Sequence, residues 1–200
     1  MVWLPAGAQT PPIFQPGAPG ADTRTITAEQ SVALSRTHFT PADVRFMQHM
    51  LVHHAQAVEM VDLLQTRGSD PTIARLGQRI TLSQDAEMAL MRDWLVARGQ
   101  PLAMADAHAG HAGMDHSMAV MPGMLSPAQM QTLGASAGPN FDRLFLQGMI
   151  QHHQGALDMV GELMAEPNSA EDPLLSDFAA SVVADQSAEI LRMQTLLSDL

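Results

Sequence analysis

The chain has 200 residues, 46% of them hydrophobic, a size and composition that suit one domain or two small halves sharing a core. It carries 21 acidic and 10 basic side chains, and a formal net charge of −11 disfavours binding to nucleic acid. Cysteine is absent, which excludes disulfides, thiolate metal sites and thiol catalysis, and without a run of about 18 apolar residues we expect no membrane insertion.

The first segment, residues 1–26, is rich in Pro, Gly and Ala and predicts a flexible arm. Its start lacks the basic region of a signal peptide. The absence of cysteine suits an oxidising compartment, so we expect the mature form of a periplasmic or secreted protein. A cytosolic chain with a loose N-terminus would have the same features.

Beyond the arm, the chain contains the same unit twice, in residues 27–98 and 126–200. The pattern Phe-x3-Met-x2-His-His-x2-Ala-x2-Met occurs in both at a constant separation, as His53 and His152 show (152 − 53 = 99). Each unit predicts a short helix followed by a helical hairpin. We expect the long helices at residues 41–66, 71–98, 140–165 and 173–199, and no β-sheet.

The predicted helix starts carry capping side chains. Thr40, Asp70 and Asp172 each precede a proline, and Ser126 with Gln129 resembles a capping box. Four long amphipathic helices in two hairpins predict an all-α fold, a four-helix bundle with pseudo-twofold symmetry in which both units form one domain.

Two adjacent histidines lie at the edges of the core-facing stripe of the first long helix. At about 100° per residue, His53 and His54 flank Met50. The same spacing recurs in the second unit, which favours metal ligation, although a histidine at a core edge can be structural and methionine also fills cores. The predicted ligands are His53, His54, Met50, Met60 and Met91 in the first unit, and His152, His153, Met149, Met159 and Met193 in the second.

The partner helix places polar groups on an otherwise apolar stripe. Glu87 and Gln84 of the first unit, and Glu189 and Gln186 of the second, would be costly to bury without partners. We expect them to lie behind the metal ligands, with the carboxylates orienting the imidazole rings. A buried His–Glu–Gln network that only specifies the fold is the alternative.

The linker between the units, residues 99–125, is rich in His, Met, Gly and Ala. A flexible segment has little core to fill, so its methionines are not easily explained by packing. Thioether sulfur selects Cu(I) and imidazole accepts Cu(I) or Cu(II). The predicted linker ligands are His108, His111, Met114, His116 and Met118.

Both copies of the signature are followed by Gln-x2-Glu-x3-Met, and together they resemble a bacterial family of domains of unknown function, which includes the CopM-like copper-binding proteins. The resemblance covers residues 27–98 and 126–199. It implies a ferritin-like four-helix bundle, a periplasmic location and copper binding for handling or resistance. Gly148 stands where the first unit has His49, so the two halves are expected to differ in affinity.

The leading functional expectation is a protein that binds copper for sequestration, transfer or resistance and is not an enzyme. Copper exporters or chaperones would be its partners, and a homodimer stays open. One alternative is a ferritin-like metal-dependent oxidoreductase, but such sites need Glu-x-x-His motifs, and the sequence has none. The other is a structural or interaction module whose histidine network binds no metal.

Overall fold

The computed structural model describes residues 12–15, 22–28, 31, 38–103 and 121–200. It divides the chain into two compact units, Met1–His38 and Phe39–Leu200. The predicted linker ligands at residues 108–118 lie outside the described residues.

The described part of the first unit contains a small antiparallel sheet. Strand β1 (Ile13–Gln15) pairs with strand β2 (Arg24–Ile26). The sheet corrects the expectation that the chain has none. Strands of three residues are too short for the alternating pattern by which a sequence indicates a strand.

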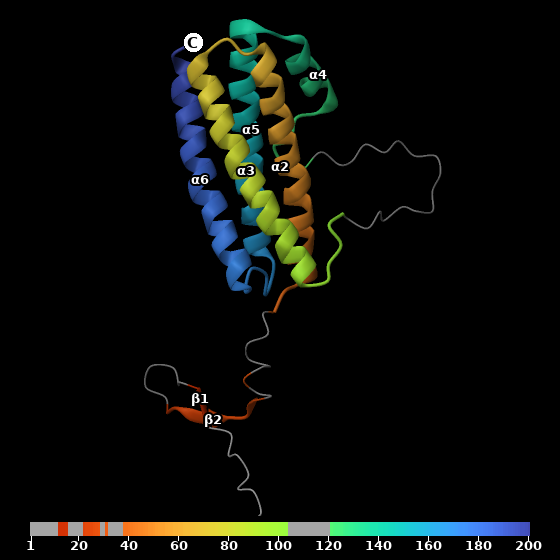
Figure 1. The fold of residues 1–200 in the computed structure, drawn as a ribbon, viewed down its shortest axis with the longest axis vertical. Helices are drawn as coiled ribbons and strands as arrows, with labels where there is room; N and C mark the ends of the chain where they lie inside the picture. The colour runs from red at the N-terminus through yellow and green to blue at the C-terminus, as the bar shows by residue number, and fades with distance from the viewer. Residues whose placement is uncertain (1–11, 16–21, 29–30, 32–37, 104–120) are drawn as a thin grey trace, which may run out of the picture. The chain divides into compact units, whose positions relative to one another are not determined.

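The second unit is a helical bundle, as predicted (Figure 1). Its long helices all lie within two residues of the predicted bounds, and a short helix precedes the second hairpin. In chain order the helices are α2 (Pro41–Arg67), α3 (Pro71–Ala97), α4 (Pro127–Ala135), α5 (Gly138–Ala165) and α6 (Pro173–Ser198). None of the described helices is long and apolar enough to cross a membrane.

The helix starts follow the predicted capping chemistry. Thr40 and Ser126 form capping boxes, while Asp70 and Asp172 each accept two backbone N–H groups of the first turn. A proline opens each of these helices, where its missing N–H costs no hydrogen bond.

Two buried aspartates tie the hairpins to each other. Asp142 on α5 accepts hydrogen bonds from the backbone N–H groups of Ser69 and Asp70 and from the Ser69 hydroxyl, in the loop before α3. Its counterpart Asp43 on α2 accepts from the backbone N–H of Ala170, before α6. Each hairpin therefore accepts hydrogen bonds from the loop of the other hairpin, and these bonds hold the two repeats in one bundle.

The core is divided into two apolar clusters along the bundle. The Met50 cluster gathers side chains from within residues 46–51 of α2, 88–95 of α3, 156–163 of α5 and 175–182 of α6. The Met149 cluster gathers them from within residues 57–64, 73–80, 141–149 and 190–193 of the same helices, with Leu125 and Leu133. This order makes α2 antiparallel to α3 and α5, and α6 antiparallel to α5. The residues between the two clusters form the middle of the bundle.

Candidate metal centre

A layer of polar side chains crosses the middle of the bundle between the two apolar clusters. We call it the polar layer; it consists of His53 and His54 of α2, Gln84 and Glu87 of α3, His152 and His153 of α5, and Gln186 and Glu189 of α6. The four histidines and two glutamines are buried, with at most 2% of any of them exposed. The two glutamates reach the surface, with 12% and 20% of their side chains exposed.

Each histidine uses its Nε2 atom for a hydrogen bond. His54 contacts the Glu87 carboxylate at 2.5 Å, and His153 contacts that of Glu189 at 2.6 Å. These are the two carboxylates that the sequence places behind the histidine pairs, one on each hairpin.

The other two histidines contact backbone carbonyls. The His152 Nε2 atom lies 2.8 Å from the carbonyl oxygen of His53, and the His53 Nε2 atom lies 3.0 Å from that of Pro122. The arrangement breaks the pseudo-twofold symmetry, because the partner of His53 comes from the segment before α4 and not from the opposite histidine.

These partners determine which nitrogen carries the proton. Carbonyl and carboxylate oxygens only accept hydrogen bonds, so each Nε2 must be the N–H. In a neutral ring, Nδ1 is then an unprotonated lone pair. Within the described part of the chain, the Nδ1 atoms of all four histidines are buried with no hydrogen-bond partner, and so are the Oε1 atoms of Gln84 and Gln186.

Six electron-pair donors thus lie in one buried layer without a proton donor. A buried acceptor left unsatisfied costs about 1–3 kcal/mol, so such a group in a native protein calls for an unrecorded water or ion. Imidazole nitrogen and amide oxygen are both donors that metal ions accept, so the residues of the layer fit a metal ion by their chemistry.

The environment favours neutral rings at the centre of the layer. Burial, with a smaller contribution from His54, lowers the pKa of His53 to about 3. Burial, followed by His53 and His153, lowers the pKa of His152 well below its usual range. Metal ligation needs the unprotonated ring, so neither residue has to lose a proton near neutral pH in order to bind.

The predicted methionine ligands are buried, but they group differently from the repeats. Met50 and Met91 share the Met50 cluster with Met159 of the second unit. Met149 and Met193 share the Met149 cluster with Met60 of the first. Antiparallel packing of α2 on α5 causes the exchange, because the end of one helix meets the start of the other. Each cluster thus combines two of the predicted methionine ligands of one repeat with one of the other.

Histidine and carboxylate side chains alone do not complete a site. No group of three or more His, Asp or Glu side chains among the described residues is placed to hold a metal ion. An ion in the polar layer would therefore need donors besides imidazole, such as methionine thioether sulfur or the glutamine amide oxygens. Met50 lies three and four residues before the histidines of α2, and side chains at these spacings are neighbours on a helix.

Sequence reasoning missed the segment that covers His53. Residues 121–125, here called the strap, connect α5 and α2: Gln56 exchanges two hydrogen bonds with Leu125, and Gln151 donates to the carbonyls of Gly123 and Met124. Every residue has a backbone carbonyl, so the sequence does not indicate which carbonyl accepts a hydrogen bond. The usable signal was Gly155, which stands where the first repeat has Gln56.

The comparisons agree with this fold. The model of the DUF305 family, described as a domain of unknown function, matches residues 43–197. A DUF305 fragment from Deinococcus radiodurans is 34% identical in sequence and superposes with a TM-score of 0.67, over 81% of this chain and 99% of that one. A DUF305 protein from Streptomyces coelicolor, described as a candidate secreted protein, is 31% identical, with a TM-score of 0.67 over 79% and 93% of the two chains.

A third solved structure is CopM in its Cu(I)-bound form. It is 25% identical, with a TM-score of 0.59 over 81% of this chain and 98% of that one. CopM has also been crystallised with Cu(II) and with silver. A comparison with curated proteins found no match. The family model spans most of the chain and parts of both repeats, and the chain therefore belongs to the DUF305 family.

Proposed function

We propose that this protein binds copper in the polar layer and holds it for sequestration or transfer outside the cytoplasm. The observation that carries the proposal is the set of four buried Nδ1 lone pairs, which face no proton donor and lie between two methionine-bearing clusters. The leading ligands are one histidine pair and one methionine from each repeat: His53 and His54 with Met50, and His152 and His153 with Met149.

Cu(I) fits this donor set better than harder ions do. Thioether sulfur is a soft donor that selects Cu(I), while Zn(II) or Ni(II) would accept the imidazoles but gain little from the methionines. Apolar clusters on both sides suit an ion of low charge, because desolvation of a cation grows steeply with its charge. Glu87 and Glu189 would fix the orientation of His54 and His153.

The relatives support copper as the ion. CopM, which shares the fold, has been crystallised with Cu(I), Cu(II) and silver, and silver is also a soft monovalent cation. The Streptomyces coelicolor relative is described as a candidate secreted protein. A chain without cysteine can bind soft metals where thiols would be oxidised, so we infer a periplasmic or extracellular location.

We also infer a carrier and not an enzyme. The residues 108–118 of the linker would supply weaker, exchangeable copper sites and would pass the ion to an exporter or chaperone. Buried ligands favour retention over turnover, since burial limits the access of a substrate to the ion.

The test is an anaerobic Cu(I) titration against a chromophoric chelator. It compares the wild-type chain with the double variants His54→Gln/His153→Gln and His53→Gln/His152→Gln. Glutamine keeps an N–H near the Nε2 position but has no lone pair at the Nδ1 position. Removal of outer partners of a metal site costs about 10–100-fold in affinity, so loss of these ligands should cost about 100-fold or more. Circular dichroism would check that each variant is folded.

The same titration separates the alternatives. A wild-type chain that takes no copper from the chelator contradicts the proposal and leaves the polar layer as a structural network. If all three proteins bind copper equally well, the copper site lies in the linker and not in the bundle.

A further inference from the structure

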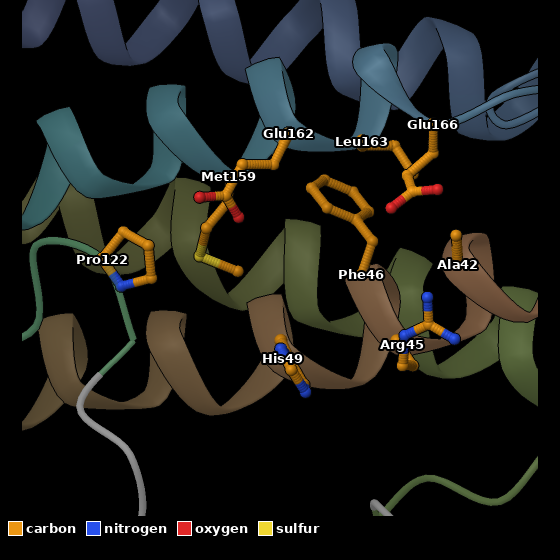
Figure 2. A pocket seen from close by; sticks show the side chains of 9 residues that line it. All are labelled: Ala42, Arg45, Phe46, His49, Pro122, Met159, Glu162, Leu163 and Glu166. Atoms are coloured by element: carbon orange, nitrogen blue, oxygen red, sulfur yellow. The ribbon is translucent and has the colours of Figure 1, made fainter.

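A pocket of about 200 Å³ opens between the first half of α2 and the last half of α5 (Figure 2). Arg45 and His49 come from α2, and Met159 and Glu162 come from α5. Pro122 of the strap lines it as well.

Residues that line the pocket also lead to the polar layer. The carbonyl oxygen of Pro122 accepts the hydrogen bond of His53, and the proline also lines the pocket. Met159, 5% exposed, lines the pocket and belongs to the Met50 cluster. His49 lies one helical turn before His53 on α2. The pocket therefore marks a place where the buried site approaches solvent.

The duplicated half of the bundle has no imidazole and no guanidinium at the equivalent place. With the offset of 99 residues, Leu144 replaces Arg45 and Gly148 replaces His49. A Cβ atom at Gly148 would lie 3.0 Å from the Leu125 side chain and 3.1 Å from that of Met60, so this space is already filled.

A second pocket on that side contains neither a thioether nor a charged group. It is lined by Leu125, Ala128, Gln129, Thr132, Leu133, Leu144, Gln147, Gly148 and Gln151. Among the described residues, imidazole, thioether and carboxylate groups line the first of these two pockets and not the second.

The charges of the first pocket favour a cation. Glu162 and Glu166 supply two carboxylates against the single guanidinium of Arg45. The imidazole of His49 and the thioether of Met159 are the two donor types that soft cations prefer.

We propose that this pocket is an outer capture site for Cu(I), with His49 and Met159 as donors, from which the ion passes to the polar layer. The inference rests on the proposed copper function and adds to it a place of uptake. The second repeat lacks this site, so uptake takes place from one face of the bundle.

The test measures the rate at which the apo-protein takes Cu(I) from a chromophoric chelator, by anaerobic stopped-flow absorbance. The variant His49→Ala should be slower by about tenfold or more, since a capture site that concentrates a cation raises association rates by at least that factor. Glu162→Gln should also be slower. Arg45→Gln should be faster, because it removes a like charge. His38→Ala and Glu59→Gln, at exposed positions that do not line the pocket, serve as matched controls and should keep the wild-type rate.

A second measurement does not depend on a variant that folds. Silver ions are added to wild-type protein labelled with 15N in its histidines, and the ring nitrogen of His49 should shift once the polar layer is filled and silver is in excess. A wild-type chain that takes no copper overturns both the proposed function and the capture site. Two results would overturn the capture site alone: an uptake rate in His49→Ala equal to that of the wild type, or a His49 ring that stays unshifted even when silver is in excess over the polar layer.

Discussion

His152 donates its Nε2–H to the main-chain carbonyl of His53, over 2.8 Å, and the two rings lie with their centroids 3.8 Å apart. The contact joins α5 to α2 at the middle of the bundle, where neither ring has access to solvent. Two protonated rings at this distance would repel each other in a medium that screens charge poorly. The pair is therefore stable as two neutral rings, and acid should oppose folding there.

Acidification is accordingly expected to destabilise the copper-free protein. The pKa of His53 is about 3 in the folded state against 6.5 in a free side chain, so the unfolded chain binds more protons between these values. Stability is complete above pH 6.5 and falls as the pH decreases toward 3. For His53 alone, the loss at pH 5 is on the order of 2 kcal/mol. Urea unfolding at pH 7.5, 6 and 5 measures it.

The double variant His53→Gln/His152→Gln is the control for this pH dependence. Its amides keep an N–H donor for each carbonyl and do not titrate. Its unfolding free energy should change much less between pH 7.5 and 5 than that of the wild type. An equal slope in both proteins would show that other groups cause the acid sensitivity.

Much of the fold could be predicted because its signals are local. Capping side chains and prolines mark the starts of α2, α3, α4 and α6, and the structure confirms these starts. For α5, which has no side-chain cap, the predicted start at residue 140 is two residues late. Periodicity similarly placed Glu87 on the buried stripe of its helix, where it hydrogen-bonds His54.

The relations between the repeats could not be read from the sequence. Met60 and Met50 lie in the same repeat and are predicted to share a site, but antiparallel packing places Met60 in the cluster of Met149. The contact of His53 with Pro122 depends on the path of a connecting segment, and a backbone acceptor has no residue preference. Periodicity assigns a residue to a face of its own helix, whereas the partner of that face depends on the tertiary arrangement.

The carboxylates of the polar layer should tune copper affinity more than stability. Glu87→Gln and Glu189→Gln keep an acceptor oxygen for His54 and His153 but remove the charge that makes the imidazole a stronger donor to metal. We expect each variant to bind Cu(I) about 10–100-fold more weakly, the usual cost of losing an outer partner. Competition with a chelator measures the affinity. Glu59→Gln, an exposed position on α2, is the control, and an equal loss in it would point to net charge as the cause.

Asp43 and Asp142, which accept hydrogen bonds from the loop of the opposite hairpin, should contribute strongly to stability. Asp142→Ala leaves the backbone N–H groups of Ser69 and Asp70, and the Ser69 hydroxyl, without their acceptor. Hydrogen bonds to a charged group contribute about 1.5–3 kcal/mol each, so a loss of about 3 kcal/mol or more is expected in urea unfolding. Asp62→Ala, at an exposed position of α2, should change little. Equal effects of the two variants would contradict a specific role for Asp142.

Gly155 should control the position of the strap over His53. A Cβ atom there would lie 2.0 Å from the carbonyl oxygen of Pro122 and 2.5 Å from the Cα atom of Gly123. Both neighbours are backbone, so Gly155→Ala must displace the strap and remove the acceptor of His53. We expect a loss of about 1–3 kcal/mol, typical of overpacking, and a shift of the His53 ring nitrogens in 15N spectra.

Gly161 on the same helix is the matched control, because nothing lies within 4 Å of a Cβ atom built there. Gly161→Ala should raise the free energy of unfolding by up to about 1 kcal/mol through helix propensity alone and leave the His53 ring unshifted. The two substitutions add the same methyl group to the same helix, and they are expected to change stability in opposite directions. If Gly155→Ala also stabilised the protein and left His53 unchanged, the strap would not be held against α5 in solution.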